Sequence, residues 1–178
     1  MEGQRNYVVF TAVGPDRPGL VNELSALIRE AGANLEDSRM AILGGEFAMI
    51  MLISGSEEVV ERVKQIGARV ENDLKLRCIL KETRRVAPPS DYLPYRIDVR
   101  GADRPGIVQA VASILASRGI NVASLESRVT YAPESGTPLF DLEAVLHVPS
   151  KIVLSELRSE LAATCEKEGL DFTLEPAA

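Results

Sequence analysis

The chain has 178 residues, 46% hydrophobic and 26% charged, with a formal net charge of −6. This balance is typical of a globular protein, and the acidic excess excludes a primary nucleic-acid surface, because phosphate binding needs clustered Lys and Arg. No apolar run approaches the length of a membrane span, and the first residues have no signal-peptide core, so we expect a cytoplasmic protein without membrane contact.

In the first half, alternating apolar residues predict a strand over 8–13, which Gly14 and Pro15 end. A helix follows to about Ala31, capped either by Asp16 or by Arg17 with Pro18 at the first helical position. Strands over 34–43 and 47–53 flank a tight turn at 44–45. Ser56 then reads as the cap of a second helix, and alternation over 74–81 predicts a fourth strand.

A segment over 83–92 has no periodicity and is rich in Pro, Arg and Ser, so it reads as a linker. The second half repeats the order: a strand from Tyr95, a helix, a strand over 121–131, a longer hairpin over 133–138, and a strand over 140–147. A helix stopped by Gly169 leads into a last strand. Each half therefore reads as β-α-β-β-α-β.

The two halves are an internal repeat of one domain. The octapeptide at 14–21 returns at 101–108, with six of eight residues identical and an offset of 87 that the following apolar positions share. We therefore expect a first domain over 1–82, the linker over 83–92 and a second domain over 93–178. The expected fold class is α+β: two ferredoxin-like sandwiches, each an antiparallel four-stranded sheet with two helices on one face.

The two sheets are predicted to differ on their helix-free faces. The strand over 47–53 is apolar on both sides, so the first sheet has an apolar open face. The open face of the second sheet is charged and carries Arg96, Asp98, Arg100, Asp141 and Glu143. We infer that a partner surface, either the second domain or another chain, covers the first sheet.

The repeated turn is chemically suited to a small anion. Gly19 and Gly106 permit close approach of a backbone, and the helix starts behind them present free amides and the positive end of the dipole. Asn34 and Asn121, at the heads of the second strands, can add a donor and an acceptor. The alternative is purely structural: a good helix start, solvated arginines and a turn asparagine.

The pattern Asp-Arg-Pro-Gly-[Leu/Ile]-Val, an apolar helix, Gly-x-Asn-[Leu/Val] and a hairpin resembles the ACT domain. Two such domains with little else resemble the family of glycine cleavage system repressors. The resemblance implies edge-to-edge pairing, a homodimer or higher oligomer, and an amino-acid ligand, glycine being suggested, at the domain interfaces. It implies a protein partner such as a DNA-binding transcription factor. The implied ligand-binding residues are Asp16, Arg17, Gly19, Leu20, Asn34, Asp103, Arg104, Gly106, Ile107 and Asn121.

Two other functions compete with an amino-acid sensor. One is a ligand-free adaptor, in which the tandem domains serve only for docking. The other is an acylphosphatase-like hydrolase, since Arg17 and Asn34 resemble the Arg and Asn that such enzymes aim at a phosphate. We expect no catalysis, because the chain has no phosphate-cradling loop and one histidine, His147. No metal or cofactor is expected either, since Cys78 and Cys165 share no ligand spacing and read as buried thiols.

Overall fold

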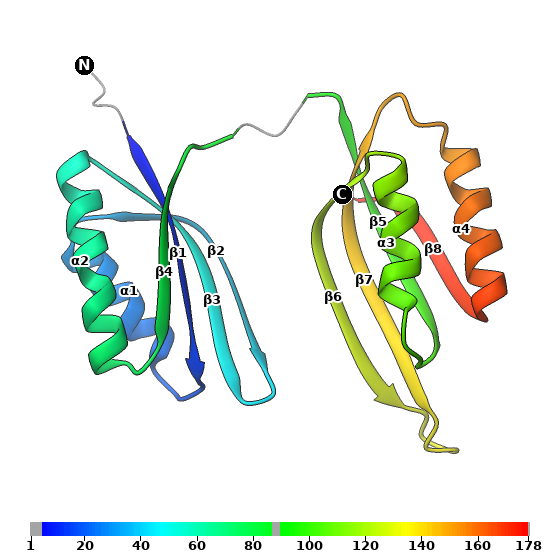
Figure 1. The fold of residues 1–178 in the computed structure, drawn as a ribbon, viewed down its shortest axis with the longest axis horizontal. Coiled ribbons are helices and arrows are strands. Elements are labelled where there is room, and N and C mark those ends of the chain that lie inside the picture. The colour runs from blue at the N-terminus through cyan, green and yellow to red at the C-terminus, as the bar shows by residue number, and fades with distance from the viewer. Residues whose placement is uncertain (1–4, 87–89, 178) are drawn as a thin grey trace. The chain divides into compact units, whose positions relative to one another are not determined.

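The computed structural model describes residues 5–86 and 90–177. The chain divides into two compact units, Met1–Ala87 and Pro88–Ala178, and each is described by itself. Both units are coloured along the chain in Figure 1.

The first unit is a four-stranded antiparallel sheet with the strand order β2-β3-β1-β4. Its two helices cover one face of the sheet (Figure 1). The elements in chain order are β1 (Asn6–Pro15), α1 (Leu20–Glu30), β2 (Asn34–Leu43), β3 (Glu46–Gly55), α2 (Glu57–Asp73) and β4 (Arg77–Thr83).

The second unit repeats this topology with the order β6-β7-β5-β8. Its elements are β5 (Tyr92–Ala102), α3 (Ile107–Ser117), β6 (Asn121–Tyr131), β7 (Pro138–Pro149), α4 (Leu154–Glu168) and β8 (Leu170–Pro176). The predicted fold class, two βαββαβ sandwiches with antiparallel sheets, is therefore confirmed.

Each unit has its own core between sheet and helices. In the first, alternate residues of β1 such as Phe10 and Ala12 pack with Met51 of β3 and with Val63 of α2. In the second, Ile97, Leu146, Leu157 and Leu161 are fully buried. The period of two along the strands and of about 3.6 along the helices directs these side chains to one shared layer.

The start of α1 and the end of α2 differ from the prediction, and strands β1, β3, β5 and β7 extend beyond their predicted limits. Helix α1 begins at Leu20 rather than at Arg17 or Pro18, and its N-cap is Gly19 in a left-handed conformation with no side-chain cap. Leu74 belongs to the C-terminal end of α2 rather than to the fourth strand, because the helix continues to Asp73 and the chain reverses at Lys75, whose φ is +59°. The predicted cap of α2 is confirmed, since Ser56 Oγ accepts the amide of Val59 at 3.4 Å.

The helix-free faces have the predicted chemistry. On the first sheet, Val13, Ile50 and Ile79 are 42%, 48% and 72% exposed. The pairing of β1 with β3 and β4 places Val13 and Ile79 on the same face as Ile50. A partner that covers this face stays a prediction.

Candidate functional site

The repeated turn forms a corner in each unit, residues 16–20 (the first corner) and 103–107 (the second corner). Both are fastened to the neighbouring hairpin, since the Asp16 amide donates to Gly45 O and the Asp103 amide donates to Pro138 O, each at 3.0 Å. Gly19 and Gly106 have φ angles of +96° and +100°. A side chain is strained in this backbone conformation, so glycine is favoured at both positions.

The helix start at each corner has backbone amides without a hydrogen-bond partner within residues 5–86 and 90–177. Among the described residues, the amides of Leu20, Val21 and Asn22 have no acceptor, and α1 and α3 lack a side-chain cap. Helix α2, with its Ser56 cap, does not share this feature. Unpaired amides and the positive end of the helix dipole favour an anion at the corners.

The two predicted arginines are already paired. Arg17 Nη1 and Nη2 donate to Glu23 Oε1 and Oε2 at 2.6 and 2.7 Å, which raises the pKa of Arg17 and lowers that of Glu23. Arg104 Nη2 lies 2.6 Å from Glu168 Oε2 and also donates to the Glu168 carbonyl. Both guanidinium groups therefore have a carboxylate partner within the unit, and their contact with a ligand stays a prediction.

The first corner opens into a hollow of about 630 Å³. The hollow lies against strand β2, which contributes Met40 and Ile42. Its lining comprises Asp16, Arg17, Pro18, Gly19, Leu20, Val21, Asn22, Ser25, Met40, Ile42 and Phe47. Four of the five ligand residues predicted for the first copy thus meet in one place. The sequence did not identify Met40 and Ile42 as part of the site, because nothing in the local pattern of an apolar strand shows that these residues lie near the corner.

Asn34 does not join its own corner. It lies at the opposite end of β2, six residues before Met40, or about 20 Å along the strand. Because Arg17 is at the other end of the unit, the Arg and Asn pair of the hydrolase hypothesis is not formed. Asn121 is placed in the same way, opposite His147, whereas the second corner follows Ala102, which pairs with Leu139.

The Asn34 side-chain amide instead donates a hydrogen bond to the carboxylate of Glu36, which lies on the same edge strand. Asn34 Nδ2 donates to Glu36 Oε1 at 2.9 Å, and Ser54 Oγ donates to the same oxygen at 2.5 Å. Glu36 occupies an irregularity in the pairing of β2 with β3, and Arg5 lies 3.5 Å from its carboxylate. The Ser54 bond, followed by the Asn34 bond, lowers the pKa of Glu36.

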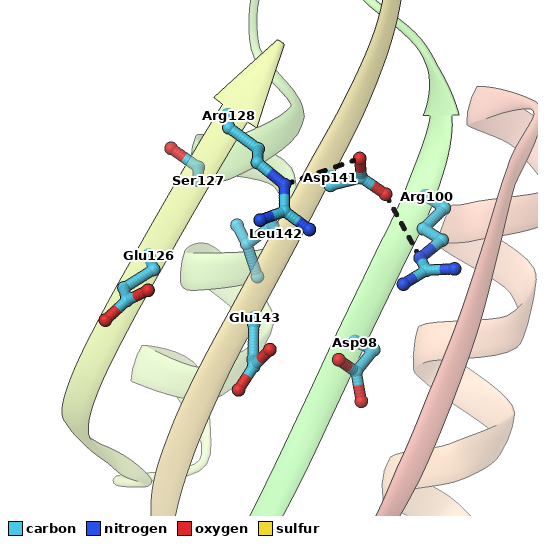
Figure 2. A pocket seen from close by; sticks show the side chains of 8 residues that line it. All are labelled: Asp98, Arg100, Glu126, Ser127, Arg128, Asp141, Leu142 and Glu143. Atoms are coloured by element: carbon cyan, nitrogen blue, oxygen red, sulfur yellow. Dashed lines mark ion pairs between the residues drawn. The ribbon is translucent and has the colours of Figure 1, made fainter. Parts of the chain in front are cut away.

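A second, smaller hollow of about 110 Å³ lies on the helix-free face of the second sheet (Figure 2). Asp141 pairs there with Arg100 at 3.0 Å and with Arg128 at 3.9 Å. The neighbouring Glu143 is held by Arg96 at 2.7 Å. The charged face predicted for this sheet is present, and ion pairs between neighbouring strands bring its positive and negative side chains together.

No group of three or more His, Cys, Asp or Glu is placed to hold a metal ion within 5–86 and 90–177. In the same ranges no helix combines the length and the apolarity needed to cross a membrane.

The fold and the corners define a class: a ferredoxin-like α+β domain repeated in tandem, each copy with an uncapped helix start after its first strand. Models of the ACT domain match residues 6–78 and 95–166, and the chain belongs to the ACT-domain family. The resemblance read from the repeated motif is thereby confirmed.

The chain is similar to regulatory proteins along most of its length. It is 29% identical over 161 residues to the glycine cleavage system transcriptional repressor of Escherichia coli K12, covering 90% of this chain and 85% of that protein. A solved putative glycine cleavage system transcriptional repressor superposes with a TM-score of 0.74 at 30% identity, covering 97% and 98% of the two chains. An unknown protein from Galdieria sulphuraria reaches a TM-score of 0.81 at 30% identity, covering 98% and 100%.

Proposed function

We propose that this chain is a non-catalytic cytoplasmic regulator that binds a free amino acid at its corners and passes the bound state to a protein partner, a DNA-binding transcription factor. The observation that carries the proposal is the first corner, where unpaired helix-start amides and a free carboxylate line one hollow. The similarity to a transcriptional repressor along 90% of the chain supports the regulatory half.

The corner offers a partner to each end of an amino acid. The α-carboxylate of the bound amino acid would accept hydrogen bonds from the amides of Leu20 and Val21. Its α-ammonium would donate to Asp16, whose side chain is exposed and makes no hydrogen bond or ion pair within the described residues. Asp103 holds the matching place in the second corner, and is likewise exposed.

Asn34 can reach only a corner of another domain, and a second copy of the chain can supply one. Strand β2 is an edge of its sheet, and most of its residues are exposed. Antiparallel pairing of two β2 edges would place the Asn34 end of one copy beside the corner of the other, because the strands run in opposite directions. We therefore propose a homodimer or higher oligomer, with Asn34 and Asn121 acting across the interface.

A thermal-shift panel of the proteinogenic amino acids tests the sensing half. A true ligand at a hundred-fold excess over Kd stabilises the folded protein by about 2.7 kcal/mol. For a unit of this size that corresponds to a rise in Tm of roughly 10 °C or more. The Asp16→Asn plus Asp103→Asn variant, which keeps the shape and removes the charge, should lose most of this rise. If no amino acid at millimolar concentration moves the Tm of the unaltered chain, sensing is refuted.

A ligand-free adaptor is the second candidate, favoured by the apolar open face with Val13, Ile50 and Ile79. Exposed apolar surface of this kind marks protein-interaction sites. The same panel separates the two functions, because an adaptor keeps one Tm in the presence of every amino acid.

A further inference from the structure

We propose that the first corner selects an amino acid with an apolar side chain, of the size of leucine or methionine, over glycine. This inference rests on the proposed function, since it names the class of ligand for the same site. It concerns the apolar side chains that line the hollow together with Asp16 and the helix-start amides, here called the apolar wall.

That wall is apolar and incompletely covered. Val21, Met40 and Ile42 line the hollow and are 42%, 48% and 52% exposed. Leu20 and Phe47, which are 2% and 1% exposed, form the buried part of the lining. Apolar surface in contact with water is unfavourable, so a ligand that covers these three side chains gains binding free energy from them.

Glycine has no side chain with which to cover this wall. A hollow of about 630 Å³ lies within the range of small-molecule sites, which are apolar with a few placed polar groups. Here the polar groups, Asp16 and the amides of Leu20 and Val21, suit the backbone that all amino acids share. The apolar wall is what distinguishes one side chain from another.

The second corner is the natural comparison, because its matching positions are known from the strand pairing. Ile42 pairs with Phe47, as Val129 pairs with Phe140. Met40 is therefore matched by Ser127, which pairs with Leu142 as Met40 pairs with Met49. A serine replaces the long apolar side chain, so the preference for an apolar ligand belongs to the first corner.

Isothermal titration calorimetry of the full chain with L-leucine, L-methionine and glycine tests the proposal. We expect leucine or methionine to bind at least about tenfold more tightly than glycine, the gain of partly burying one such side chain. Leucinamide, which lacks the carboxylate, should bind more weakly than leucine. Met40→Ser, which copies the second corner, should reduce the leucine-to-glycine ratio several-fold, and Ile42→Ser is a second variant of the same kind.

Leu43→Ser is the matched control. Leu43 is 73% exposed on the same strand, but it pairs with Glu46 and points to the other face of the sheet, away from the hollow. This variant should keep the leucine-to-glycine ratio of the unaltered chain. Circular dichroism of each variant verifies that it folds.

The outcomes separate this inference from the proposed function. Equal or tighter binding of glycine overturns the apolar preference and leaves amino-acid sensing intact. A leucine-to-glycine ratio that survives both Met40→Ser and Ile42→Ser also overturns it, because the side chain would then lie elsewhere. Absence of binding by every amino acid refutes sensing itself, and the inference falls with it.

Discussion

Replacing Gly106 by alanine measures the free-energy cost of the left-handed backbone conformation at a corner, without a contribution from side-chain contacts. Gly106 is the N-cap of α3, with φ +100° and ψ −8°. A Cβ added there would have no atom within 4 Å, so the whole cost is conformational. A left-handed conformation costs a non-glycine residue about 1–2 kcal/mol, and alanine recovers roughly 0.4–1 kcal/mol by restricting the unfolded chain. We expect a net loss of about 1 kcal/mol.

For a unit of this size, 1 kcal/mol lowers the Tm by about 4–8 °C, which calorimetry resolves. Gly106→Asn is the matched control, because asparagine tolerates left-handed conformations and should cost less than alanine. Alanine that matches the glycine protein in stability, or asparagine that costs more than alanine, would contradict this reasoning. Gly19→Ala should behave similarly, since its Cβ would meet only the flexible end of Glu23, at 3.2 Å.

Two further predictions concern titratable groups. Ser54→Ala removes the main hydrogen bond that lowers the pKa of Glu36, so that pKa should rise toward its ordinary value in an NMR titration. The stabilisation by Glu36 is present above the unfolded-state pKa and disappears as the pH falls through the lowered folded-state pKa, so the variant should lose it at a higher pH than the unaltered chain. Cys165 is 2% exposed, whereas Cys78, which was also expected to be buried, is partly exposed. Burial raises the thiol pKa of both, so the difference in access decides: a thiol reagent should modify Cys165 more slowly than Cys78, and equal rates in the folded protein would contradict the burial.

Local patterns predicted most of the architecture. The alternation of Val8, Phe10 and Ala12 placed β1 correctly, and the left-handed Gly169 ends α4 as its position after an apolar stripe indicated. The errors lie at ends where two local signals competed. At the start of α1, Pro18 is a good first helical residue, but the left-handed turn at Gly19 delays the helix until Leu20.

The candidate site was predicted only in part, because it joins segments that are distant along the chain. The residues of a corner are consecutive, so the motif identified Asp16, Gly19 and Leu20 together. Nothing local shows that Met40 approaches them, since that depends on how β2 pairs with β3.

The sequence by itself determined the duplication, the order of the elements and the glycine in each repeated corner, since all three follow from short-range periodicity and from repeated residue types. Only the tertiary structure decided which groups surround that corner. In the structure Arg17 pairs with Glu23, and Met40 and Ile42 line the hollow. Asn34 lies at the far end of β2, where its side chain contacts Glu36. The physical reason is that an antiparallel sheet places residues by strand register and direction, and neither can be read from a neighbouring residue.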